Sequence, residues 1–217
     1  MRAAAASLVL ALVACAGPSA TPSPPAEAEA AVPTRLRGTL LAGADSTLVF
    51  VACGTVTERM VSAPPSSQLL LAVTAVNGAV RDSLFVEFTA DTTGGDITVR
   101  ETLFATSLVE GTRCDRPREP FEVVATGNEP FWRVTFDGTQ LVLERPEPPR
   151  EMVFDVVPGD TRGTLTTIIG RRTLGKVHEL KLGLLHESCS DGMSDAWYPY
   201  RAEVRVGDLA LRGCARR

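Results

Sequence analysis

Two short segments of the 217-residue chain hold most of the side chains that could recognise a ligand. The first runs from Gly127 to Trp132 and the second from Cys189 to Tyr200, and together they contain both tryptophans and both tyrosines. Carboxylates stand among these aromatic groups, and polar side chains that converge among aromatic ones are typical of concave ligand sites. We therefore predict a binding surface made of Asn128, Glu129, Trp132, Asp191, Met193, Asp195, Trp197 and Tyr198.

The same two segments also suit a purely structural role. Asn and Asp side chains satisfy neighbouring backbone amides, prolines set rigid corners, and Gly127 and Gly192 permit a positive φ. In this interpretation Trp132 packs on a Cys189–Cys214 bridge and the tyrosine hydroxyls bond to the backbone. The residue types alone leave both interpretations open.

The sequence does not predict any of the common enzyme classes that short motifs identify. The sequence has no GxSxG, P-loop or HExxH motif, and neither of its two histidines has a recognisable catalytic setting. One catalytic alternative remains, in which Glu129 and either Asp191 or Asp195 act as acid and base on a glycan, since such hydrolysis needs two carboxylates about 5 to 10 Å apart. We predict a non-catalytic protein without a cofactor.

The N-terminus has the pattern of an export signal. One positive charge, Arg2, precedes an apolar stretch, Ala3–Val13, that is too short to be a stable transmembrane anchor. Residues 12–15, Leu-Val-Ala-Cys, resemble the bacterial lipobox, whose cysteine is acylated with chains such as palmitate. We therefore predict a signal peptide over 1–14 and a lipidated Cys15, whose several acyl chains would hold it in a lipid bilayer.

Residues 15–34 are predicted to form a tether. The stretch Ala16–Thr34 holds five of the fifteen prolines together with alanine, serine and threonine, a composition that cannot bury a core. Ala16 stands where an inner-membrane retention signal usually places aspartate, which favours the outer membrane. We expect an exported, lipid-anchored protein of the cell envelope that faces the periplasm.

Two β domains are expected after the tether. Charges and prolines at 115–120 divide a first domain, 35–116, from a second, 119–217. The first has the order β-β-β-α-β-β, with its helix expected over Ser66–Val76, which fits an OB-like five-stranded barrel with one helix. The second alternates short strands with turns such as Asp137-Gly138, which predicts a small antiparallel β-barrel or sandwich. The expected fold class is mainly β.

Four cysteines remain besides Cys15, and an even number in an exported chain suggests disulfides. Four cysteines allow three pairings. Grouping by domain selects Cys53 with Cys114 and Cys189 with Cys214. A zinc site is the competing interpretation, but the sequence has no CxxC or HxxxH spacing to support it.

Two resemblances extend these expectations. The motifs GNEPFW at 127–132 and CSDGMSD, followed by YPY, at 189–200 resemble a family of bacterial envelope lipoproteins marked by GNEPFW and CSDGMSDxxYPY. That family has no established activity to transfer. In the first half, RGT at 37–39, FVACG at 50–54 and FVE at 85–87 resemble the OB-like domain of NlpE-type envelope lipoproteins. Both resemblances imply an envelope lipoprotein.

The NlpE-like resemblance also implies a copper-related role as an alternative. His178, His186 and Met193 are soft donors, but the two histidines would lie about 26 Å apart along a strand, too far to chelate one ion. We therefore predict no metal site. The formal charge of −4 disfavours nucleic acid as a partner. The overall prediction is a membrane-anchored envelope lipoprotein that acts as a non-catalytic binding or envelope-maintenance module, with an envelope protein or a small ligand as its partner.

Overall fold

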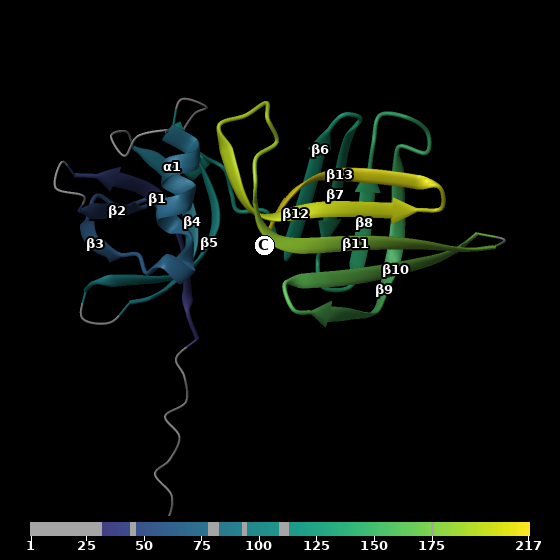
Figure 1. The fold of residues 1–217 in the computed structure, drawn as a ribbon, viewed down its shortest axis with the longest axis horizontal. Coiled ribbons are helices and arrows are strands. Elements are labelled where there is room, and N and C mark those ends of the chain that lie inside the picture. The colour runs from purple at the N-terminus through teal and green to yellow at the C-terminus, as the bar shows by residue number, and fades with distance from the viewer. Residues whose placement is uncertain (1–31, 44–46, 78–82, 93–94, 109–112, 175) are drawn as a thin grey trace, which may run out of the picture. The chain divides into compact units, whose positions relative to one another are not determined.

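A computed structural model describes residues 32–43, 47–77, 83–92, 95–108, 113–174 and 176–217. The predicted signal peptide, Cys15 and nearly all of the predicted tether lie outside these residues. Strands dominate the described residues, and one α-helix is present among them, which confirms the mainly β class (Figure 1). None of the described helices is long and apolar enough to span a membrane.

Five strands and the helix come first in the chain. They are β1 (Thr34–Ala42), β2 (Leu48–Ala52), β3 (Glu58–Ser62), α1 (Leu69–Asn77), β4 (Leu84–Asp91) and β5 (Ile97–Ser107). β1 pairs with β2 and β4, β2 pairs with β3, and β5 pairs with β3 and β4, so the pairings return to the strand from which they start. Of these pairings, the one between β3 and β5 is parallel.

Helix α1 closes the core of these five strands. It follows a 3₁₀ turn at Pro65–Ser67, and the Ser67 hydroxyl accepts a hydrogen bond from the backbone N–H of Leu69 at 3.4 Å. Leu69, Ala72 and Val73 are buried among strand side chains, as expected for one apolar helix face. The helix thus lies between β3 and β4 in sequence, where the apolar spacing predicted it (Figure 1).

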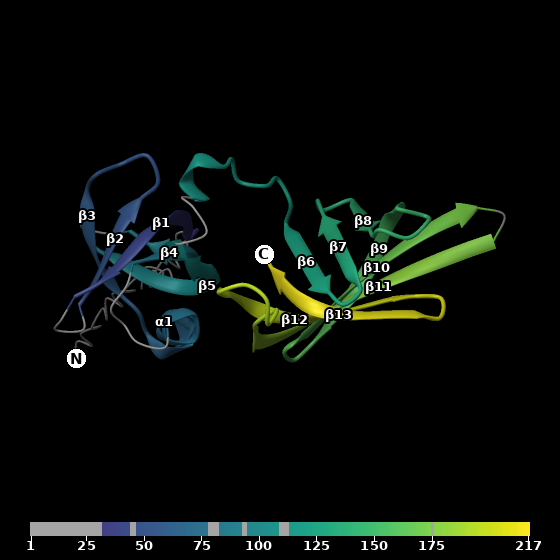
Figure 2. The ribbon, with the colours of Figure 1, turned by 90° about the horizontal axis from the view of Figure 1, so that it is seen from above.

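Eight further strands form a closed antiparallel barrel (Figures 1 and 2). They are β6 (Val123–Asn128), β7 (Phe131–Phe136), β8 (Gln140–Glu144), β9 (Glu151–Arg162), β10 (Leu165–Leu174), β11 (Lys176–Cys189), β12 (Ala196–Val206) and β13 (Leu209–Arg216). Each strand pairs with the next, and β13 pairs back with β6. Of the two forms that the sequence predicted, barrel or sandwich, the structure has the barrel.

Alternation of side chains along the strands fills the barrel. On β11, Leu180, Leu182 and Leu184 point inward and are fully buried, while Lys181 between them is exposed. The same core holds Trp132, the largest of its buried side chains. Successive outward positions of β10 to β13 therefore form one outer face of the barrel.

Strand β12 belongs to two cores. Its first residues, Ala196 and Trp197, pair with Thr106 and Ala105 of β5, and its later residues pair with β11 and β13. The Trp197 side chain is buried among the residues of β1 to β5, and its indole N–H donates to the Ser188 hydroxyl at 2.7 Å. The second predicted domain thus supplies a core side chain to the first group of strands.

Two disulfides join the predicted cysteines. Cys53 is bonded to Cys114 and Cys189 to Cys214, with Cα atoms 5.3 Å and 5.6 Å apart. Both separations lie within the ordinary range for a disulfide. The pairing selected by grouping the cysteines is confirmed, and the second bond ties the end of β11 to β13.

We predict that Trp197→Ala lowers the free energy of unfolding by about 3 to 5 kcal/mol, because it removes a fully buried aromatic side chain and leaves a cavity. Urea unfolding of the purified protein measures the change. Phe131→Ala is the matched control, since the Phe131 side chain is 57% exposed and its loss should cost less than about 1 kcal/mol. Equal losses in the two variants would contradict the shared core.

Candidate functional site

An open groove lies where the two predicted segments meet. Its volume is about 580 Å³, and the Cys189–Cys214 disulfide forms part of its wall. One side comes from the turn between β6 and β7, and the other from the loop between β11 and β12. The side chains and backbone around it belong to Gly127, Asn128, Glu129, Ser188, Cys189, Ser190, Asp191, Gly192, Met193, Arg201, Arg212, Gly213 and Cys214.

Asp191 organises the loop between β11 and β12. One carboxylate oxygen accepts the backbone N–H groups of Met193 and Ser194 at 3.1 and 2.8 Å, and the other accepts the Ser194 hydroxyl at 2.8 Å. Gly192 has a φ of +71°, in the left-handed region that favours glycine. The carboxylate is therefore used in shaping its own turn, as the structural interpretation of the sequence predicted.

Asn128 joins the two sides of the groove. Its side-chain amide donates to the backbone carbonyl of Asp191 at 3.4 Å, so the β6–β7 turn and the Asp191 loop are held together across 63 residues of sequence. Glu129 follows Asn128 and is exposed at the rim of the groove. Met193 on the facing loop is 76% exposed. This part of the groove rim therefore presents a carboxylate, a flexible thioether and backbone.

Trp132 lies beneath the groove rather than in it. The side chain is completely buried, and its indole N–H donates to the backbone carbonyl of Arg212 at 3.3 Å. A Cβ atom on Gly127 would lie 2.2 Å from the indole nitrogen, and one on Gly213 would lie 2.9 Å from the ring. Gly127 is therefore required by the space that Trp132 occupies, and not by a positive φ as the sequence suggested.

The remaining predicted residues lie elsewhere. Trp197 is buried in the core of β1 to β5. Tyr198 is partly buried, and its ring lies edge-on to that of Phe104, with the ring centroids 5.3 Å apart. Asp195 has an exposed side chain and is absent from the groove lining, while its backbone carbonyl accepts the N–H of Ser107 at 3.3 Å. Of the eight predicted residues, the groove brings together Asn128, Glu129, Asp191 and Met193.

Two arginines that were not predicted as site residues also line the groove. Arg201 is on β12 and Arg212 on β13, both at outward positions of the barrel. The Arg201 guanidinium bonds the exposed Glu187 carboxylate at 3.2 Å. Alternation of polar and apolar residues along both strands does predict outward arginines, but only the register between β12 and β13 places them beside the motif loops.

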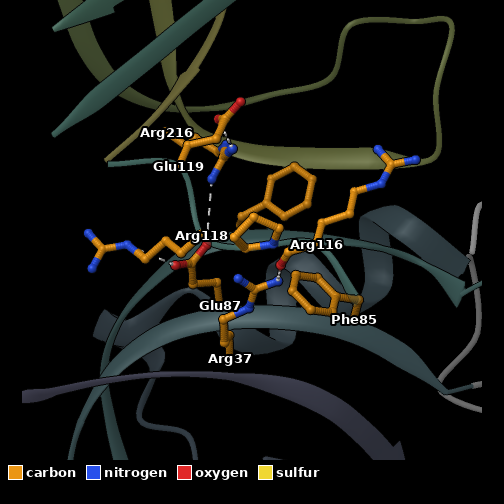
Figure 3. A pocket seen from close by; sticks show the side chains of 9 residues that line it. Arg37, Phe85, Glu87, Arg116, Arg118, Glu119 and Arg216 are labelled. Atoms are coloured by element: carbon orange, nitrogen blue, oxygen red, sulfur yellow. Dashed lines mark hydrogen bonds and ion pairs between the residues drawn. The ribbon is translucent and has the colours of Figure 1, made fainter. Parts of the chain in front are cut away.

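A second, smaller cavity of about 120 Å³ contains a cluster of charged residues (Figure 3). Four arginines and two glutamates line it together with apolar groups. The charged residues are Arg37, Arg116, Arg118, Arg216, Glu87 and Glu119. Glu87 pairs with Arg118 and Arg216, and Glu119 pairs with Arg216, as the dashed lines of Figure 3 show.

Glu87 is the most buried charged residue of this cluster, with only 4% of the residue exposed. It accepts a charged hydrogen bond from Arg35 at 2.7 Å and pairs with Arg216 at 3.6 Å. Arg216 in turn bonds Glu119 at 2.6 Å, and Glu119 bonds Arg133 at 2.6 Å. Burial lowers the pKa of the Arg216 guanidinium, while the carboxylates of Glu119 and Glu87 oppose that change. Both glutamates are thus paired with arginines, and because four arginines line the cavity against two glutamates, the cluster keeps an excess of positive charge.

The Tyr200 hydroxyl has a structural partner. It donates to the Glu101 carboxylate at 2.9 Å, and burial, with the Glu101 charge, raises the pKa of Tyr200 to about 12. The ring also faces His186, with centroids 5.1 Å apart. Among the residues that the structure describes, no group of three or more His, Cys, Asp or Glu side chains could hold a metal ion.

We predict that Gly127→Ala destabilises the protein by about 1 to 3 kcal/mol, because the added methyl overlaps the Trp132 indole and the backbone carbonyl of Arg212. Thermal unfolding and the fluorescence of the buried indole measure the effect. Gly183→Ala is the matched control, since its Cβ would have no neighbour closer than 3.7 Å. If both variants unfold at the same temperature as the original protein, Trp132 does not require the glycine.

Comparison of the chain with protein-family models, with curated proteins and with solved structures finds no match in any of the three. The two family resemblances suggested by the motifs therefore stay predictions. What supports a function is the geometry of the groove and of the residues that build it.

Proposed function

We propose that the protein is a cell-envelope lipoprotein, anchored in the outer membrane through an acylated Cys15 and facing the periplasm, that acts as a non-catalytic binding module. In this proposal the groove between the β6–β7 turn and the Asp191 loop takes up an envelope protein. The lipobox-like sequence supports the lipid anchor. The proline-rich tether would hold the folded part of the chain clear of the membrane.

The observation that carries the binding role is the groove itself. Two segments far apart in sequence, both singled out by their aromatic and acidic residues, are hydrogen-bonded across it by Asn128. The groove is open, and Met193 presents a largely exposed apolar side chain beside it. Flexible methionine side chains adapt to varied partner surfaces, which suits a protein-binding role.

The hydrogen bonds of Asp191 support a non-catalytic role. Acid and base work on a glycan needs two available carboxylates, and Asp191 has both of its oxygens bonded to its own turn. Asp195, the other candidate, is not part of the groove lining. This leaves Glu129 without the partner that the glycan-acting alternative requires.

We also propose that β1 to β5 form an OB-like barrel. The pairing order β1-β2-β3-β5-β4, which leads back to β1, and the position of α1 between β3 and β4 both support this assignment. OB-like barrels serve many functions, so the proposed function does not depend on it.

Cys15→Ser should abolish membrane anchoring. We expect the unaltered protein in the outer-membrane fraction, with acyl chains on Cys15 detected by mass spectrometry, and the variant in the soluble periplasmic fraction. Ala16→Ser, one residue further on, is the matched control and should leave both results unchanged. The proposed anchor would be overturned if the protein without substitutions had an unmodified mature N-terminus that lies away from Cys15.

Met193→Asp should remove partner capture at the groove. Chemical cross-linking in intact cells, followed by purification of the full chain, should recover a partner with the original protein and lose it with the variant, because a new charge is placed in the apolar contact. Met60→Asp is the matched control, since Met60 is 50% exposed on β3. Equal recovery of every cross-linked protein by both variants would contradict binding at the groove.

A further inference from the structure

A hollow of about 410 Å³ adjoins the groove on the outer face of the barrel. It is bordered by β10, β11, β12 and β13, and it shares Arg201 and Arg212 with the groove. The register places Leu165, Leu185 and Arg201 in one row across three strands. The neighbouring row holds Gly183, Glu203 and Arg212. The hollow therefore passes from apolar to charged side chains across the sheet. Its lining comprises Leu165, Gly183, Leu185, Arg201, Ala202, Glu203 and Arg212.

Gly183 lies in this hollow, and the fold does not require a glycine there. Its neighbours Leu182 and Leu184 point into the core, so position 183 faces outward. A Cβ atom would meet nothing closer than 3.7 Å, and the φ of Gly183 is not positive. By contrast, side chains at Gly127 and Gly213 would overlap other atoms.

A glycine inside a strand lowers stability, and it often marks a bulge, a bend or a place where an outside group approaches the backbone closely. The register of β11 with β12 shifts between His186 and Cys189 and not at Gly183, which favours a close approach. The space above Gly183 is flanked by Leu165, which is 42% exposed, and by the partly buried Leu185. The hollow can thus accept one apolar side chain of moderate size against leucine and bare backbone.

The charged end of the hollow is suited to a carboxylate. Arg212 lies opposite Glu203 in the strand pair, but the Glu203 carboxylate bonds Arg205 at 2.6 Å instead. Arg201 carries the second guanidinium, and its bond to Glu187 is between two largely exposed groups, which makes it weak. Planar guanidinium groups recognise carboxylates well because they donate two parallel hydrogen bonds.

We propose that this hollow binds an acidic segment of the partner protein, with an apolar side chain above Gly183 and a neighbouring carboxylate on Arg212 and Arg201. This inference rests on the proposed function, since the segment would continue into the adjoining groove. A long acyl chain fits less well, because the apolar floor extends only from Leu165 to Leu185 and then meets charged residues.

The test uses the full chain in nanodiscs and measures fluorescence anisotropy of a labelled hexapeptide, Gly-Ser-Asp-Leu-Gly-Ser. Gly183→Val should weaken its binding by about tenfold, because the hollow is filled. Arg212→Gln should weaken it by about fivefold, as expected for an exposed charge pair. Ala210→Val and Arg162→Gln, which alter exposed positions elsewhere on the barrel, should leave binding unchanged.

Probe chemistry distinguishes the occupants. Peptides with Lys in place of Asp, or with Ser in place of Leu, should bind more weakly than the Asp-Leu peptide. The proposal is overturned if the Asp-Leu peptide does not bind, if Gly183→Val binds it normally, or if dodecyl phosphate binds in a Gly183-dependent manner and the peptide does not. Gly183→Ala fills the hollow partly and serves if the valine variant does not fold.

The same assay separates this inference from the proposed function. Met193 is not part of the hollow lining, so Met193→Asp should lose the cross-linked partner and still bind the hexapeptide. Partner capture that depends on Met193, together with absent peptide binding, would overturn the hollow alone. Both proposals would be overturned if partner capture did not depend on Met193 and peptide binding did not depend on Gly183.

Discussion

The structure depends on one strand, β12, because side chains from its two halves are buried in two different hydrophobic cores. Trp197 is buried among β1 to β5, while Ala202 and Val204 are buried inside the eight-stranded barrel. Side chains of a strand alternate between its faces, so a slip of one residue would expose all three of these groups to water. Burial in the two cores therefore fixes the register of β12, and this register places the motif loop that precedes it.

Ion pairs add a second constraint close to β12. Glu87 is almost fully buried, and a buried carboxylate is tolerated only when cations and hydrogen bonds compensate its lost hydration. Arg35 and Arg216 supply that compensation from β1 and β13. Removing one partner of these ion pairs would leave a buried charge without compensation. The cluster therefore contributes more to the correct pairing of the strands than to their stability.

The mainly β class, the helix and the disulfide pairing could all be predicted because they depend on local pattern and on counting. The site could be predicted only in part. Asn128 and Asp191 were identified by residue types that shape turns, and they do meet. The binding-surface interpretation placed Trp132 and Trp197 at the surface, but both are buried, because the sequence does not reveal which face of a strand an indole occupies. Arg212 became part of the site only through the register of β12 and β13.

The Cys189–Cys214 bond has a further consequence because it forms part of the groove wall. A wall that contains a disulfide takes its final shape only where thiols are oxidised, and the cytosol keeps them reduced. In the proposed function, the newly made chain would therefore lack the finished groove wall until it reached an oxidising compartment. For a protein with that function, oxidation would be a maturation step that comes before association with the proposed partner.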